Sequence, residues 1–294
     1  MPDQADKLRE LVHGAPPPER DDAPGPPMIV VTGGKGGVGA TTVAVNLAAV
    51  LGDRGQRVVL VDAARQHADL AQVAGVGPIS GGTVADILAG KCSAADALTP
   101  GPAGTLLLAN RWAPKSSPDF SRHAQHRLLA ELQTLGDVTD LLVVDAGSGL
   151  TPWTRRFWLR ARLVVAVATT DDVAVMDTYA AIKLSAADAT AADVRVLANQ
   201  CDSDAITDDV QRRLTTACQR FLGRNVPALP ALPRHMTIGT ACVPRVWEAP
   251  NSPFGHAVLW LGHAVADVLA NHESQIGNEK GGMLSTRSVV SMSQ

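Results

Sequence analysis

Residues 28–42 read MIVVTGGKGGVGATT: a short apolar run, a turn rich in glycine and the start of a helical pattern. The spacing of Gly34, Gly39 and Thr41 is that of a phosphate-binding loop, and the order strand, loop, helix is the one that this loop requires. Its glycines let backbone N–H groups converge on an anion beside the N-terminus of the following helix. We therefore expect a nucleotide here, with the hydroxyl of Thr41 on its Mg²⁺ ion. The residues expected to contact the nucleotide are Gly34, Lys35, Gly36, Gly37, Val38, Gly39, Ala40, Thr41 and Thr42.

One position of this loop departs from the usual pattern. The lysine that normally follows the last glycine and meets the β- and γ-phosphates is replaced by Ala40. A lysine stands earlier in the loop instead, as Lys35 in the stretch GGKGGVG. The sequence therefore keeps the anion cradle and loses one of its charges.

After the loop, short apolar runs alternate with longer helical patterns. We expect strands at 28–32, 57–61, 105–109, 140–144, 163–168, 194–198 and 226–232. We expect helices at 42–53, 83–89, 119–135, 172–187, 208–222 and 252–271. Strands separated by helices imply right-handed crossovers. The expected fold class is therefore α/β, a three-layer, mostly parallel twisted sheet with helices on both faces.

The composition favours one folded nucleotide-binding domain, which we place at 28–272. Hydrophobic residues make up 46% of the 294 residues and charged residues 19%, which excludes a wholly disordered chain. The 26 basic and 29 acidic residues give a net charge of −3, and only 3% of residues are aromatic. These values argue against a nucleic-acid partner, because such proteins present a basic surface or an aromatic stacking platform.

The two ends of the chain differ from this domain. Residues 1–14 form a short amphipathic helical pattern, which would become ordered only against a partner or the domain itself. Residues 15–27, APPPERDDAPGPP, contain six prolines and predict an extended, semi-rigid linker. Residues 273–294 are polar and rich in glycine and serine, so we expect a flexible tail.

The sequence favours a cytoplasmic location. Cys92, Cys201, Cys218 and Cys242 are far apart and form no C-x-x-C pair, so we interpret them as reduced core residues and not as a metal site or disulfides. The N-terminal stretch lacks the basic and apolar regions of a signal peptide. The longest apolar runs have the length of a strand, well short of the roughly 18–20 residues that a membrane span needs.

The loop KGGVGAT, 35–41, resembles the deviant phosphate loop of the MinD/ParA family, K-G-G-x-G-K-[ST]. The resemblance implies binding of ATP and Mg²⁺ and a nucleotide-dependent homodimer. In that family the early lysine, here Lys35, reaches across the dimer interface to the nucleotide of the other subunit. Lys35 would then restore part of the charge that is missing at Ala40.

Two more stretches resemble the switch regions of this family. In VLVDAARQHADLA, 59–71, Asp62 has the place of the first acid of a D-x-D strand end, and Ala64 replaces the second acid, which would position the attacking water. The stretch DLLVVDAGSGL, 140–150, brings Asp145 to the Mg²⁺ ion through water. The resemblance thus implies Thr41, Asp62 and Asp145 at the metal. It assigns no catalytic residue, and the two alanines imply weak or absent ATP hydrolysis.

The positions that hold the adenine base in this family are matched by Asn199, after the strand expected at 194–198, and by Pro233 in the turn LPR, 232–234. His235 replaces the acid that the family has after the proline. For Asn199 the alternative is a helix-capping or turn-forming role.

The stretch VATTDDVAVMDTYAAIKL, 167–184, resembles a segment of the flagellar number regulator FlhG, also called YlxH or FleN. At the N-terminus, DQADKLR, 3–9, matches the D-Q-A-x-x-L-R activator motif of that group, through which a tethered helix stimulates the SRP-type GTPase FlhF. Flagellar basal-body components are further implied partners, and recruitment to the cell pole or the inner membrane face is an implied localisation. The residues implied in partner binding are Asp3, Gln4, Ala5, Leu8 and Arg9.

Two alternatives stay open at this point. Alanine at positions 40 and 64 resembles the sequences of the pilus-assembly relatives TadZ and CpaE. This resemblance favours a pilus or secretion-system localisation factor. An active ParA-like partition ATPase is the other, and the missing lysine, the missing acid and the acidic net charge oppose it. The helix expected at 252–271 has no Lys or Arg, which is typical of a helix packed on the core, so contact with a membrane stays unproven.

Overall fold

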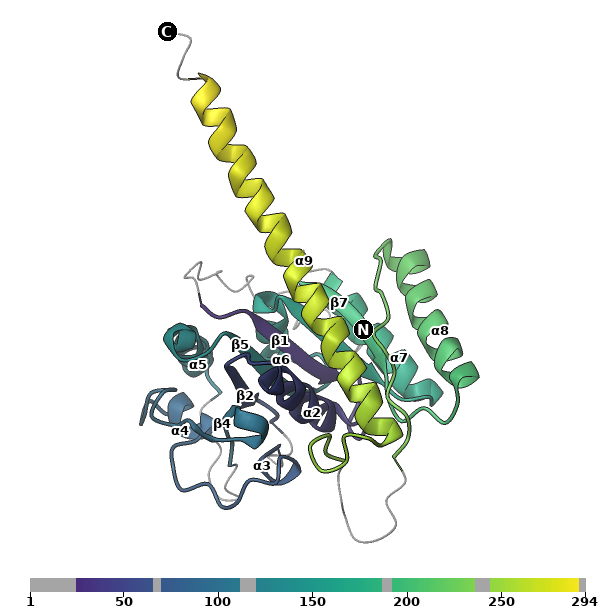
Figure 1. The fold of residues 1–294 in the computed structure, drawn as a ribbon, viewed down its shortest axis with the longest axis horizontal. Coiled ribbons are helices and arrows are strands. Elements are labelled where there is room, and N and C mark those ends of the chain that lie inside the picture. The colour runs from purple at the N-terminus through teal and green to yellow at the C-terminus, as the bar shows by residue number, and fades with distance from the viewer. Residues whose placement is uncertain (1–24, 66–69, 112–119, 187–191, 236–243, 291–294) are drawn as a thin grey trace, which may run out of the picture.

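The computed structural model describes residues 25–65, 70–111, 120–186, 192–235 and 244–290. Its centre is a seven-stranded sheet with the order β3-β4-β2-β5-β1-β6-β7 (Figure 1). The pairs are parallel except for β3 and β4 at one edge, which are antiparallel. The expected α/β class with a mostly parallel sheet is confirmed.

The central strands are buried on both faces. All residues of β1, β2 and β6 are buried, which is why these strands are continuous apolar runs and show no alternating pattern. The strands span Met28–Gly33 (β1), Val58–Asp62 (β2), Thr99–Pro100 (β3), Leu106–Leu108 (β4), Leu141–Ser148 (β5), Leu163–Ala168 (β6) and Asp193–Ala198 (β7).

Helices cover both faces of the sheet, and each face has its own apolar core. One core is formed with α2, α3 and α9, and the other with α4, α5, α6, α7 and α8. The helices span Ala40–Asp53 (α2), Leu70–Val73 (α3), Val84–Leu88 (α4), Arg122–Gln133 (α5), Pro152–Arg160 (α6), Asp172–Ala186 (α7), Asp204–Leu222 (α8) and Pro253–Val290 (α9). Two short 3₁₀ turns lie at Pro102–Gly104 and Thr134–Asp137.

The strand expected at 226–232 is absent. This segment runs beside β7 but makes only two isolated bridges, Val196 to Ala228 and Cys201 to Pro233. Prolines at 227, 230 and 233 have no N–H to donate, so a continuous ladder cannot form. The expectation of a strand was wrong, because the apolar residues of the segment fit a strand and its prolines do not.

Helix α6 was missed by the sequence analysis. It begins at Thr151, whose hydroxyl accepts a hydrogen bond from the N–H of Thr154, and Pro152 occupies its first turn. Threonine at the N-cap followed by proline is a recognised start signal. The signal was therefore present in the stretch TPWT, but no run of aliphatic residues follows it.

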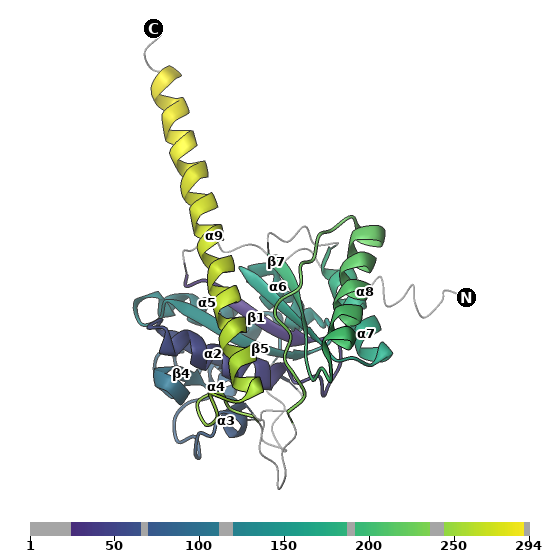
Figure 2. The same cartoon turned by 45° about the vertical axis from the view of Figure 1, so that its right-hand side comes forward.

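Helix α9 is longer than expected. It continues to Val290, where the sequence analysis placed the end of the helix near 271 and a flexible tail from 273. No proline follows Pro253 in this helix, and hydrogen bonds between its turns can therefore continue. The segment expected as a tail is helical from 273 to 290, and Figures 1 and 2 show this part of α9 extending away from the sheet. Its flexibility stays a prediction.

The expected N-terminal helix at 1–14 and most of the linker at 15–27 lie outside the described residues. Within the described part of the chain, no helix combines the length and the apolar character needed to cross a lipid bilayer.

The first half of α9 packs against α2 at close range. Val258, Leu261 and Val265 are buried in this contact. A Cβ atom added at Gly262 would lie 2.3 Å from a methyl carbon (Cγ1) of Val50. The two helices therefore approach to a distance that only glycine allows at position 262.

We expect Gly262→Ala to destabilise the protein. Alanine favours the helix by about 1 kcal/mol relative to glycine, but overpacking a core typically costs about 1–3 kcal/mol, so a net loss is expected in chemical denaturation. Val50→Ala removes the opposing methyl groups. In the Val50→Ala background the same glycine substitution should be neutral or stabilising. Equal losses in both backgrounds would show that the contact with Val50 is not the cause.

Candidate functional site

The phosphate loop joins β1 to α2 at the carboxyl end of the central strand. Gly37 and Gly39 have φ angles of 82° and 86°, a conformation that glycine adopts readily and that is strained for other residues. A Cβ atom at Gly36 or Gly37 would meet no other atom within 4 Å, so the outer side of the loop is open. The loop therefore has the backbone form and the free space that a phosphate group needs.

The end of β7 holds this loop in place. The Asn199 side-chain amide donates a hydrogen bond to the carbonyl of Val38 at 2.8 Å, and Gln200 Nε2 donates to the carbonyl of Gly37 at 3.4 Å. A Cβ atom at Gly39 would lie only 2.5 Å from Asn199 Nδ2. Asn199 is thus buried against the loop, a contact that its sequence position did not reveal.

The expected adenine contacts are partly brought together. Pro233 pairs with Cys201, two residues after Asn199, so both predicted positions lie at the end of β7. The amide nitrogen of Asn199 is already bonded to the loop. A role of Asn199 and Pro233 in binding adenine stays a prediction.

Two carboxylates lie side by side, Asp62 at the end of β2 and Asp145 within β5. Asp62 and Asp145 are register partners in the parallel ladder, and both are buried. One oxygen of Asp62 accepts a hydrogen bond from the N–H of Ala64 at 3.2 Å, and one of Asp145 accepts from the N–H of Gly147 at 2.9 Å. The switch segments that follow the two strands are therefore bonded to the carboxylates themselves.

This donor set fits Mg²⁺. Neighbouring buried carboxylates repel one another, and a divalent cation relieves that repulsion. In phosphate sites Mg²⁺ uses one or two carboxylates together with phosphate oxygens and water, and not a cage made only of protein ligands. Among the described residues no cluster of three or more His, Cys, Asp or Glu could hold a metal. Thr41 lies in the first turn of α2, and its role together with Asp62 and Asp145 at the ion of a bound nucleotide stays a prediction.

Both positions that depart from the usual pattern are buried. Ala40 is 8% exposed and begins α2, and Ala64 is 6% exposed beside Gly147. Neither side chain can supply a positive charge to the phosphates or an oxygen to an attacking water. The site therefore offers backbone N–H groups, a helix N-terminus and metal ligands, which are groups that bind a nucleotide.

Lys35 forms an ion pair within its own chain. Its ammonium lies 2.7 Å from a carboxylate oxygen of Asp171, in the turn between β6 and α7. The same carboxylate accepts hydrogen bonds from the Thr169 hydroxyl at 2.6 Å and from the N–H of Ala174 at 3.0 Å. Lys35, then Thr169, then Ala174 hold the pKa of Asp171 well below its usual value. The early lysine is therefore tied to the start of α7 in the single chain.

An aromatic group supports the first switch segment, and the sequence analysis did not find it. The indole N–H of Trp153, in α6, donates to the carbonyl of Ala63 at 2.7 Å. Phe120 packs edge-on against Trp153 with ring centroids 5.4 Å apart, and the Arg65 guanidinium lies 4.2 Å from the centre of the Phe120 ring. The segment after Asp62 is thus fixed by a helix that follows the other switch segment.

The five residues expected to bind a partner, Asp3, Gln4, Ala5, Leu8 and Arg9, lie outside the described residues. Their role stays a prediction.

The chain is similar in sequence to known flagellar proteins. The chain is 35% identical over 195 residues to "Antiactivator FleN" of Pseudomonas aeruginosa, which is 66% of this chain and 69% of that one. It is 30% identical over 198 residues to "Flagellum site-determining protein YlxH" of Helicobacter pylori, covering 63% of each chain.

Solved structures share the fold. The MinD protein of Pyrococcus horikoshii, complexed with Mg-ADP, matches 81% of this chain and 95% of its own at a TM-score of 0.64 and 24% identity. The MinD of Aquifex aeolicus in complex with MinC matches 82% of this chain and 96% of its own, with a TM-score of 0.68 and 19% identity. At these identities the likeness concerns the fold alone.

The family model for the CobQ/CobB/MinD/ParA nucleotide binding domain matches residues 29–241, which include the phosphate loop, both acidic strand ends and Asn199. The chain therefore belongs to the CobQ/CobB/MinD/ParA family of nucleotide-binding proteins.

Proposed function

We propose that this protein is an ATP- and Mg²⁺-binding regulator of flagellar number or placement, of the FlhG type. It hydrolyses ATP very slowly or not at all, and its N-terminal helix stimulates an FlhF-type SRP GTPase. The observation that carries the nucleotide part is the open glycine loop beside two buried, adjacent carboxylates. The flagellar part is supported by the similarity to FleN and YlxH.

Binding would use the groups that the loop presents. Backbone N–H groups of 34–39 and the N-terminus of α2 would face the phosphates, and Thr41, Asp62 and Asp145 would hold the ion. The Mg²⁺ ion would supply charge neutralisation. Because Asp62 and Asp145 also bind the N–H groups of Ala64 and Gly147, a change at the ion would be transmitted to both switch segments.

The two alanines explain why hydrolysis should be slow. Loss of one group that stabilises the transition state typically costs about two to three orders of magnitude in rate. Here both the lysine replaced by Ala40 and the acid replaced by Ala64 are missing. This site fits a regulator that acts through its ATP-bound state and not through ATP hydrolysis.

A nucleotide-dependent homodimer would complete the site. Val173 and Met176, at the start of α7, are 59% and 66% exposed and lie three residues apart, so they share one face of the helix. They follow Asp171, the residue that holds Lys35. A second subunit docked on this face would cover them and would offer its own phosphates to Lys35.

The proposed location is the cytoplasm, with recruitment to the cell pole or the inner membrane face. Flagellar basal-body components are proposed as further partners. The second candidate function is a TadZ/CpaE-type localisation factor of a pilus or secretion system, which Ala40 and Ala64 favour. An active partition ATPase is the weakest reading, because both of these residues oppose turnover.

Asp171→Asn should strengthen ATP-dependent dimerisation. Asparagine keeps the helix cap of α7 but gives up the charge that holds Lys35. An exposed ion pair is worth about 0.2–1 kcal/mol, so the dimer affinity should rise up to about fivefold per subunit in sedimentation velocity with Mg·ATP. Adding Lys35→Ala should remove the gain. A gain that survives without Lys35 would contradict the proposal.

Ala40→Lys should tighten the binding of Mg·ATP in isothermal titration. Hydrogen bonds to a charged group contribute about 1.5–3 kcal/mol, so we expect a gain of at least about tenfold. Ala40→Met, of similar length without charge, is the matched control and should give no gain. Wild-type binding weaker than about 1 mM (about −4 kcal/mol) would show that the loop does not serve as a nucleotide site.

The activator role is tested by adding the full chain, or a peptide of residues 1–14, to an FlhF-type GTPase. We expect faster GTP hydrolysis, which Gln4→Ala should abolish because it removes the polar group proposed to orient water. Asp6→Ala, at a variable position of the motif, should leave the stimulation unchanged. If GTP hydrolysis does not become faster, or is stimulated equally by Gln4→Ala, the activator proposal fails. The TadZ/CpaE-type function would then be favoured.

A further inference from the structure

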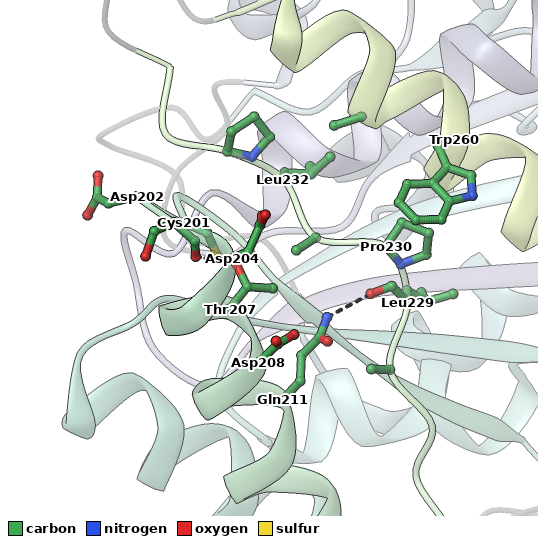
Figure 3. Close-up of a pocket in the computed structure, with 15 residues that line it drawn as sticks. Cys201, Asp202, Asp204, Thr207, Asp208, Gln211, Leu229, Pro230, Leu232 and Trp260 are labelled. Carbon is green, nitrogen blue, oxygen red and sulfur yellow. Dashed lines mark hydrogen bonds between the residues drawn. The ribbon is translucent and has the colours of Figure 1, made fainter.

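A cleft of about 670 Å³ lies at the β7 edge of the sheet. It opens between α8, the irregular segment 228–233 and α9 (Figure 3). Its size is within the range of about 300–1,000 Å³ typical of binding pockets. Gln211 of α8 donates a hydrogen bond to the carbonyl of Leu229 at 2.9 Å and ties one wall to the floor.

The lining of this cleft includes one residue expected at the nucleotide, Pro233, on the adenine side. Its lining contains no residue of the phosphate loop, neither Asp62 nor Asp145, and not Asn199. The two sites share only the end of β7 and the turn at Pro233. The phosphates and the ion of the proposed nucleotide would therefore lie outside the cleft.

The cleft is acidic. Its charged lining residues are Asp202, Asp204 and Asp208. Asp202 is neutralised by Arg234 at 2.7 Å, whereas Asp204 and Asp208 form no ion pair within the described part of the chain. Asp204 lies in the first turn of α8, where a carboxylate favours the helix. Asp208 lies a turn further along, so the helix terminus does not account for it.

The opposite wall carries an exposed tryptophan. Trp260 of α9 is 67% exposed, although its neighbour Leu261 is buried against the core. Figure 3 shows its indole at the rim of the cleft, across from the carboxylates of α8. An exposed indole is the preferred aromatic partner of a cation. Leu229, Pro230 and Leu232 add apolar surface to the floor between them.

The backbone of the floor does not favour addition of a strand. Prolines at 227, 230 and 233 remove N–H groups, and the N–H groups of Leu229 and Leu232 already bond to β7. A partner that extended the sheet would find few backbone donors here. Recognition must therefore come from side chains that enter the cleft.

From this arrangement we propose that the cleft binds a basic segment of a partner protein. An arginine of that segment stacks on Trp260 and pairs with Asp204 and Asp208, and an adjacent apolar side chain packs on Leu229 and Leu232. Arginine satisfies both walls at once, because its guanidinium stacks on aromatic rings and binds carboxylates. This inference goes beyond the proposed flagellar role and requires no nucleotide.

The test uses the full-length protein and a fluorescein-labelled helical peptide built from Leu-Ala-Arg-Leu repeats. The control peptide has citrulline in place of every arginine, because citrulline is neutral and has nearly the same shape. In anisotropy titrations the arginine peptide should bind and the citrulline peptide should bind much more weakly. D204N/D208N should weaken binding about fivefold or more, and Trp260→Ala about two- to fivefold.

The matched control is D53N/D267N, which removes two exposed acids outside the cleft, one of them in α9. It makes the same change in net charge and should alter the affinity less than twofold. In protein labelled with 5-fluorotryptophan, the resonance assigned by Trp260→Phe should shift with the arginine peptide only.

Equal affinity for both peptides would overturn the proposal, as would equal losses in D204N/D208N and D53N/D267N or a Trp260 resonance that does not move. Self-association that falls in Trp260→Ala, without peptide binding, would instead identify the cleft as a contact between copies and would also overturn it. Mg·ATP binding measured in the same variants should stay unchanged. Failure of nucleotide binding in the wild type would leave the peptide result intact, so the two proposals fail separately.

Discussion

The site depends on the way in which the end of β1 is held between two neighbouring strands. Gly33 is a register partner of both Ser148 on β5 and Val167 on β6, and its carbonyl accepts a hydrogen bond from the N–H of Gly149. A Cβ atom at Gly33 would lie 2.3 Å from Val38, so the chain turns into the loop without room for a side chain. Parallel pairing thus places the loop beside both switch segments before any ligand is bound.

The charges around the loop are distributed unusually. The usual lysine is absent, two carboxylates are buried beside the loop, and its remaining ammonium is bound to Asp171. In the single chain the ammonium of Lys35 is therefore engaged by a carboxylate and does not face a phosphate group. Lys35 can bind a phosphate only if its ammonium leaves the carboxylate of Asp171. The free energy needed to break this exposed ion pair is small.

Much of the fold could be predicted because its signals are local. Six of the seven expected strands exist, the loop follows β1, and Asp62 ends β2 as expected, whereas β5 continues past Asp145 to Ser148. The failures have physical reasons. The segment 226–232 is apolar, but its prolines prevent a continuous strand ladder. Helix α9 continues beyond the end expected at 271, through a stretch whose glycines and serines had predicted a tail. The contacts of Asn199 with Val38 and of Lys35 with Asp171 join residues far apart in the chain, so no local pattern encodes them.

The residues that follow β7 contact the phosphate loop and also line the acidic cleft. Asn199 and Gln200 bind the phosphate loop, and the next residues, Cys201 and Asp202, line the acidic cleft. Backbone hydrogen bonds of Cys201 to Leu232 and Arg234 fix this segment to the floor of the cleft, and Gln200 has a φ of 59°, a strained value for a residue with a side chain. The segment that holds Val38 is therefore continuous in the chain with the residues that line the cleft.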